Sequence, residues 1–175
     1  MSSSDPDSRL LLLMRHGKAE SGSGQPDHER HLAERGADQA RSVGAYLAAQ
    51  SVHVSRVLVS DAARTTETWE AAASQMPHFD GKVTLHEEIY TGGRTEVLSL
   101  LRAVKPKHSV VMVVGHEPTI AMLTTLLADD DSDSASIAQA RIGMPTGAMA
   151  VLSGSLDSWS ALDEDSLRLH TIVRP

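Results

Sequence analysis

The sequence predicts an α/β domain with a mostly parallel central sheet, and three observations support that class. Short apolar segments of strand length alternate with longer stretches in which apolar residues recur every three or four positions. The chain of 175 residues is 41% hydrophobic and 22% charged, which is the range of one compact domain. Aromatic residues make up only 3%, so the core has to be built mainly from aliphatic side chains. Such alternation is typical of parallel strands joined by helices.

Five segments are expected to be strands because they are short, apolar and bounded by polar or turn-forming residues. They cover residues 10–14, 56–60, 83–85, 109–115 and 148–152. In open α/β sheets, ligands bind at the carboxyl ends of the strands. Polar residues that directly follow these segments are therefore the first candidates for a functional site.

Four helices are expected between or after these strands. The first is indicated by small and apolar residues at steps of three and four, which lie on one helix face. These residues are Ala33, Gly36, Ala37, Ala40, Val43, Gly44 and Leu47. The second is expected to begin after a cap at Ser60 or Asp61 and to bury Trp69, Ala72 and Met76.

The third helix is expected to follow a turn at residues 91–93 and to end before Pro106. The fourth is expected to have Pro118 at its first position, which suits proline. The inward-facing residues of these two helices are Val97, Leu98, Leu101 and Val104, then Ile120, Leu123 and Leu127. Residues 21–29 and 129–136 are polar and rich in Ser, Asp or Gly, so we expect surface loops there.

Residues 1–8 are polar and acidic, and we expect them to be a leader in front of a single domain that covers residues 9–175. The apolar run at 10–14 is too short for a signal peptide or a membrane span. The chain has no cysteine, which removes disulfides and thiolate chemistry and fits a reducing compartment. We therefore expect a cytoplasmic monomer with no membrane partner.

The formal net charge of -7 argues against nucleic acid as a partner, because the chain repels polyanions at long range. A phosphorylated ligand would then have to be captured by a few cations in one pocket. Arg15, His16 and Gly17 directly follow the first strand, and glycine lets backbone N–H groups approach an anion. Taken alone, this triplet is equally well read as a loop with a structural histidine.

Two further segments favour a phosphate site over a structural histidine. His116 directly follows the strand at 109–115 and precedes a helix start, which favours anions. Arg64 lies in the first turn of the second helix and is able to reach the same sheet edge. By itself Arg64 is better explained as a surface residue, but the two histidines stand at equivalent strand ends.

With these elements the sequence resembles the histidine phosphatase superfamily, which is phosphoglycerate mutase-like, and within it the small SixA-like phosphohistidine phosphatases. The matching segments, in the family's order, are residues 14–19 (Met-Arg-His-Gly-Lys-Ala), 30–36, 60–68, 113–118 (Val-Val-Gly-His-Glu-Pro) and 144–148. The resemblance implies a three-layer α/β/α sandwich. Because only 27 residues separate Glu88 from His116, we expect no large lid insertion and an open pocket.

The resemblance also implies a metal-independent phosphatase without cofactor, in which His16 is the nucleophile. Arg15, Arg64 and His116 would hold the phosphoryl oxygens, with His116 as a cationic donor, because preorganised donors stabilise the charge of phosphoryl transfer. The other seven histidines lack metal-site spacing, so we expect no metal site.

Four further residues have weaker support. Glu88 is our choice of general acid, although Glu87 fits the family pattern as well, and a solvated acidic pair is the alternative. Arg30 matches an arginine of the SixA-like branch and is expected to touch substrate, but Ala33 stands where threonine is usual. Lys18 would add charge at the pocket rim, or lie free on the surface.

The open pocket favours a phosphohistidine carried by another protein as substrate. One alternative is a phosphomonoesterase that acts on a small phosphorylated metabolite with the same His16 chemistry. A second alternative, of another class, is a phosphate-binding module without turnover. The sequence does not identify the physiological substrate, the oligomeric state or a role for the acidic residues 129–133.

Overall fold

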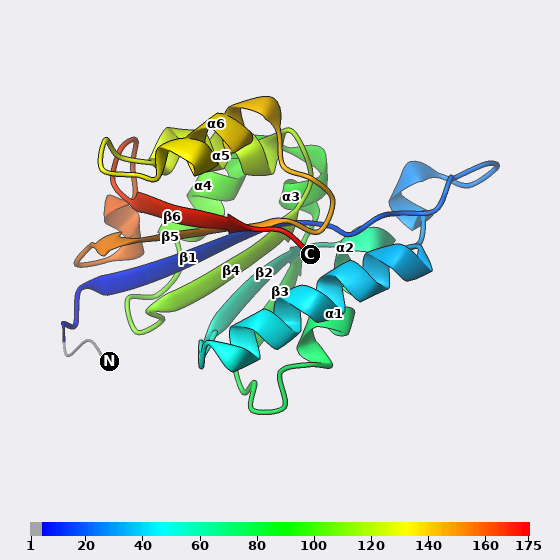
Figure 1. Cartoon of the computed structure of the whole chain (residues 1–175), viewed down its shortest axis with the longest axis horizontal. Coiled ribbons are helices and arrows are strands. Elements are labelled where there is room, and N and C mark those ends of the chain that lie inside the picture. Colours follow the sequence, from blue (N-terminus) through cyan, green and yellow to red (C-terminus); the bar gives the residue numbers. More distant parts are fainter. Residues whose placement is uncertain (1–4) are drawn as a thin grey trace.

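Two parallel strands form the middle of a six-stranded sheet (Figure 1). The computed structural model describes residues 5–175. Within it, β1 (Ser8–Arg15) pairs with β4 (Val110–Gly115), and the strand order is β3-β2-β4-β1-β5-β6. The pairs β1–β4, β2–β4 and β2–β3 are parallel, whereas β1–β5 and β5–β6 are antiparallel. The prediction of a mostly parallel sheet is confirmed.

The ends of the remaining predicted strands differ from those of the predicted segments by at most three residues. They are β2 (Arg56–Ser60), β3 (Lys82–His86) and β5 (Met149–Ser155). The edge strand β6 (Arg168–Val173) was not predicted, because only Leu169 among its residues is fully buried and its apolar pattern is weak. Antiparallel pairing needs no helical crossover, and the connection from β5 to β6 instead packs Leu156, Trp159, Leu162 and Leu167 into the core.

Helices cover both faces of the sheet and make three layers (Figure 1). On one face lie α1 (Glu34–Ala49) and α2 (Ala63–Ala73). On the other lie α3 (Glu87–Thr91), α4 (Arg94–Arg102), α5 (Thr119–Leu127) and α6 (Ser134–Ile142). Successive residues of β1 serve the two cores in turn: Leu11 and Leu13 pack beneath α4 and α5, and Leu12 and Met14 beneath α1 and α2.

Several predicted boundaries are wrong. The expected loop at 129–136 contains the start of α6, because Asp133 accepts a hydrogen bond from the Ser136 N–H at 2.9 Å and caps that helix. The cap of α2 is Ala62, not Ser60 or Asp61, and Pro118 precedes α5 instead of beginning it. The expected turn at 91–93 follows a short helix, α3, that was not predicted.

Of the expected leader, residues 1–4 lie outside the described residues, and Ser8 already belongs to β1. The polar segment 21–29 contains a single turn of 3-10 helix, Asp27–Glu29, and a second such turn covers Trp159–Ala161. No helix within residues 5–175 has the length and apolar character needed to cross a membrane.

Replacing Gly44 by alanine should destabilise the protein, because α1 and α2 pack through this position. A Cβ atom there would lie 2.1 Å from the carbonyl oxygen of Ala72. Helix propensity alone predicts a gain of about 1 kcal/mol from this change, whereas the clash predicts a net loss of about 2 kcal/mol or more. Urea unfolding measures whether the free energy of unfolding rises or falls. Exposed Ala45, replaced by glycine, measures the propensity term on the same helix, and a Gly44→Ala protein more stable than wild type would contradict this packing.

Candidate active site

The pairing of β1 with β4 brings two histidines together at the carboxyl ends of neighbouring strands. Arg15 pairs with Gly115, and the His16 N–H donates to the Gly115 carbonyl at 3.0 Å. Consequently the rings of His16 and His116 lie with their centroids 5.3 Å apart. His16 is 7% exposed, so its ring is largely shielded from water.

The ring of His16 has a defined tautomer. Its Nδ1 lies 2.7 Å from the carbonyl oxygen of Gly17. A carbonyl oxygen accepts hydrogen bonds only, so Nδ1 carries the proton and the lone pair is on Nε2. The pKa of His16 is lowered to about 4, mainly because the ring is buried and also because of the charges of Arg64 and Arg15. The hydrogen bond to the Gly17 carbonyl raises the pKa but does not outweigh these effects. At neutral pH the ring is therefore an uncharged nucleophile or base.

His116 is held by the last residue of β2. Its Nε2 lies 2.7 Å from the Ser60 hydroxyl oxygen, which also accepts the Ala62 N–H. Burial lowers the pKa of His116 to about 3, with the positive charge of Arg64 as the next cause. The expectation of a cationic His116 is thus wrong for the unliganded site, because the ring has too little water around it to hold a charge.

Three buried nitrogen atoms beside these rings have no hydrogen-bond partner. They are Arg15 Nε, Arg64 Nε and His116 Nδ1, which we call the donor cluster. Within residues 5–175 the only other such side-chain atom is Arg9 Nε. Arg15 precedes His16 in the chain, and Arg64 Cζ lies 5.9 Å from the centroid of the Tyr90 ring, which packs edge-on to His116. The charges of both arginines lower the pKa of both histidines. Unpartnered buried polar nitrogens cost stability, so the cluster suits an acceptor such as a phosphoryl group, with His116 Nδ1 a donor in the tautomer in which the Ser60 hydroxyl donates to Nε2.

Each of the two arginines is held through its other nitrogens. Arg15 donates from Nη1 to the carbonyl oxygen of Met144 at 2.7 Å. Arg64 donates to the backbone oxygen of Asp27 at 2.9 Å and to its carboxylate at 3.0 Å. Both guanidinium groups are thereby fixed, and each keeps its Nε free for a ligand.

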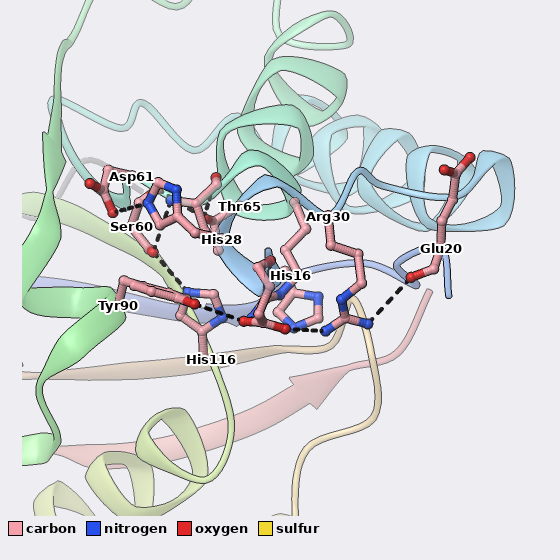
Figure 2. Close-up of polar contacts among 12 residues, drawn as sticks. His16, Glu20, His28, Arg30, Ser60, Asp61, Thr65, Tyr90 and His116 are labelled. Carbon is pink, nitrogen blue, oxygen red and sulfur yellow. Dashed lines mark hydrogen bonds and ion pairs between the residues drawn. The ribbon is translucent and has the colours of Figure 1, made fainter. Parts of the chain in front are cut away.

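Asp27 lies in the polar segment 21–29, for which the sequence predicts a surface loop. Its carboxylate accepts hydrogen bonds from Arg64, from Arg30 at 3.1 Å and from the Tyr90 hydroxyl at 2.9 Å. The Tyr90 ring also lies edge-on to His116, with a centroid distance of 5.6 Å. Figure 2 shows Arg30, Tyr90 and the two histidines gathered at one place.

Sequence reasoning missed Asp27 and Tyr90. Neither follows a buried strand directly, and neither lies on an apolar periodicity, so no local signal marks them. The one available indication was Arg30, since a carboxylate three residues before an arginine is in reach of it when the chain makes a helical turn.

Gly17 has a different role from the one expected. Its N–H donates to the Thr68 hydroxyl at 3.0 Å, so it is not free for an anion. A Cβ atom there would lie 2.4 Å from the carbonyl oxygen of Gly36, so the glycine permits a close backbone contact. The side chain of Lys18 is exposed, and its backbone N–H donates to Gln39.

Glu88 is not brought to the donor cluster. Its side chain is 59% exposed, and the nearest ion-pair partner is His86 at 3.9 Å. Glu87 is exposed as well. The general-acid role of Glu88 therefore stays a prediction without a contact to support it, whereas Arg15, His16, Arg30, Arg64 and His116 do converge. Residues 5–175 contain no group of three acidic, histidine or cysteine side chains that could hold a metal ion.

Comparison with known proteins agrees with this geometry. A model of the histidine phosphatase superfamily (branch 1) matches residues 11–90. The structure named "Putative Phosphohistidine Phosphatase SixA" from Nakamurella multipartitia is 32% identical, superposes with a TM-score of 0.84 and covers 96% of each chain. The chain belongs to the histidine phosphatase superfamily.

Within this superfamily the protein falls in the SixA-like branch and is a phosphatase. The Agrobacterium tumefaciens protein of the same name as the Nakamurella one is 29% identical, with a TM-score of 0.76 and coverage of 97% of this chain and 99% of its own. An uncharacterized protein of Mycobacterium tuberculosis is 33% identical over 141 residues, which are 79% of this phosphatase and 85% of the relative.

The lowered pKa values of His16 and His116 predict a loss of stability in acid. Below the unfolded value of 6.5 the unfolded chain binds protons that the folded protein excludes, so stability falls as the pH drops from 6.5 toward about 4. The loss should be on the order of a few kcal/mol. Urea unfolding between pH 7 and pH 4 measures it. His16→Asn and His116→Asn should each flatten the slope, and an unchanged slope in both would contradict the burial argument. His78→Asn, at an exposed position, is the control.

Proposed function

We propose that this phosphatase removes the phosphoryl group from phosphohistidine on a partner protein, through a phosphorylated His16. The observation that carries the proposal is the donor cluster: three unpartnered buried nitrogens stand beside a neutral imidazole whose Nε2 is free. Such a site suits a group that is electrophilic at its centre and negative at its periphery, which describes a phosphoryl group.

The first step is attack by His16 Nε2 on phosphorus. A bond forms between Nε2 and phosphorus, the bond to the leaving nitrogen breaks, and its electron pair goes to that nitrogen. The positive charge left on the phosphorylated His16 ring is shared with Nδ1–H, which donates to the Gly17 carbonyl. In the second step water attacks phosphorus and the bond between phosphorus and His16 Nε2 breaks. Its electron pair returns to Nε2, orthophosphate leaves with the protons of the water, and His16 is neutral again.

The donor cluster stabilises the charge on the equatorial oxygens in both steps. Arg15 and Arg64 are held by carbonyl and carboxylate groups, so they need little rearrangement when the substrate arrives. His116 supplies a third donor from Nδ1 when the Ser60 hydroxyl donates to its Nε2. A donor fixed in a buried site stabilises a transition state more than the same group in water.

The surroundings of the site support this substrate class. Between Glu88 and His116 the chain forms only the rest of α3, then α4 and β4, so no extra domain covers the entrance. A phosphorylated side chain on a folded partner fits such a site better than a free metabolite, which needs more walls. The names of the Nakamurella and Agrobacterium relatives point to the same substrate class.

Rapid-quench trapping tests the proposal. With a radiolabelled phosphohistidine protein as donor, wild type should give a phosphoenzyme that is stable in alkali and labile in acid, and His16→Ala should give none. His78→Ala, on the surface, should trap label like wild type. If a small phosphomonoester labels the enzyme while phosphohistidine does not, the substrate is a metabolite. If neither donor gives label or turnover, the protein only binds phosphate.

Loss of either arginine should slow both half-reactions. Arg15→Ala and Arg64→Ala should each reduce kcat/KM by about a hundredfold, as expected for one preorganised donor. Arg168→Ala removes an equal charge from an exposed ion pair with Asp131 and should leave the rate unchanged. Steady-state kinetics on one substrate measures all three proteins, and a fully active Arg64→Ala would show that the pocket is elsewhere.

A further inference from the structure

A carboxylate stands at the entrance of a site that is built for an anion. The Asp27 side chain is 54% exposed, yet it accepts hydrogen bonds from Arg64, Arg30 and Tyr90. A negative charge there repels an incoming phosphoryl group. We therefore expect the carboxylate to have a favourable effect on another part of the site or on a later step of the reaction. Holding Arg64 in place is one benefit, but the backbone oxygen of Asp27 already does so.

The position of Asp27 relative to the nucleophile indicates a second favourable effect, on the departure of the leaving group. His16 is 7% exposed, so the substrate has to enter from the exposed side of the site. In phosphoryl transfer the leaving group departs opposite the nucleophile. The leaving group therefore remains at the entrance, beside exposed Asp27 and the partly buried Arg30 and Tyr90 that donate to it.

The carboxylate has room for one more donor. Its Oδ2 accepts from both Arg64 and Tyr90, which uses both lone pairs, while Oδ1 accepts only from Arg30. The hydrogen bonds from Tyr90 and Arg64, together with the charges of Arg64 and Arg30, lower the pKa of Asp27 to about 2. Asp27 is thus ionised at every physiological pH and can accept a proton donor, but it cannot act as a general acid.

We propose that Asp27 is a specificity-determining residue that accepts an N–H from the leaving imidazole and so favours phosphohistidine over phosphate monoesters. This inference rests on the proposed function. The phosphorylated ring of the substrate carries phosphorus on one nitrogen, and the free Oδ1 lone pair of Asp27 binds a proton on the other. When the P–N bond breaks, its electron pair goes to the leaving nitrogen, and neutral imidazole departs with its N–H still bound to Asp27.

Without that proton the leaving group would be an imidazolate anion, which is a far poorer leaving group. The Asp27 carboxylate favours the protonated ring because opposite charges attract at short range. A phosphate monoester has the reverse requirement, since its leaving oxygen becomes negative and is repelled by Asp27. One carboxylate at the entrance therefore assists one substrate class and opposes the other.

Asp27→Asn tests this role with two substrates, phosphohistidine itself and p-nitrophenyl phosphate. The amide keeps an oxygen for Arg64 and Tyr90 but loses the charge. For phosphohistidine kcat/KM should fall by more than about tenfold, the value expected for a hydrogen bond to a charged group. For p-nitrophenyl phosphate kcat/KM should stay within about threefold of wild type or rise, because the lost bond was made only to imidazole.

The pH profile gives a second readout. In wild type, Asp27 keeps the substrate ring protonated to higher pH, so the basic limb of kcat/KM for phosphohistidine should move to lower pH in Asp27→Asn. Tyr90→Phe removes one bond to the same carboxylate but leaves its charge, so it should not invert the substrate preference. Asp61→Asn is the matched control, since Asp61 pairs with neighbouring His28 and not with the arginines.

Equal losses on both substrates, with an unmoved basic limb, would overturn the inference and leave Asp27 as a residue that only positions Arg64. The proposed function fails in a different way. Wild type would then hydrolyse p-nitrophenyl phosphate without turning over phosphohistidine, and this inference would fall with it.

Discussion

The parallel pairing of β1 with β4 is the constraint on which the rest of the site depends. Its register sets Arg15 opposite Gly115, so the residue after each strand is a histidine and the two rings meet. A shift of one residue would turn every side chain of β1 to the other face and separate the rings. Both strands are buried on each face, and this burial specifies the register strongly.

Burial also sets the chemistry of the site. The same lack of water lowers the pKa of His16, keeps Nε2 unprotonated and leaves three donors without partners. The unpartnered donors cost folding free energy, which the two apolar cores of the sheet have to offset. A phosphoryl group would accept hydrogen bonds from these donors and form a bond to the nucleophile. Binding it therefore offsets the cost of the unpartnered donors at the place where the reaction occurs.

The sequence predicted those parts of the fold and site that have a local signal. The buried strands, the periodic helices α1 and α4, and the polar residues at strand ends are of this kind, so Arg15, His16 and His116 could be found. The edge strand β6 and helix α6 have weak apolar patterns and depend on tertiary packing. The neutral state of His116 depends on how completely the fold removes water from the ring, which spacing along the chain does not reveal.

Asp27 shows most clearly what the sequence alone does not predict. Its importance comes only from contacts with Arg64 and Tyr90, which lie far from it in the chain. These contacts convert a polar loop into one wall of the site. They also link the three layers at the sheet edge, since the loop precedes α1, Arg64 lies on α2 and Tyr90 on α3.

A crystal structure with orthovanadate tests the central claim most directly. The account predicts vanadium bonded to or facing His16 Nε2, with its oxygens within hydrogen-bond distance of Arg15 Nε, Arg64 Nε and His116 Nδ1. An oxyanion bound elsewhere, or one at His16 that leaves these three nitrogens without partners, would contradict it.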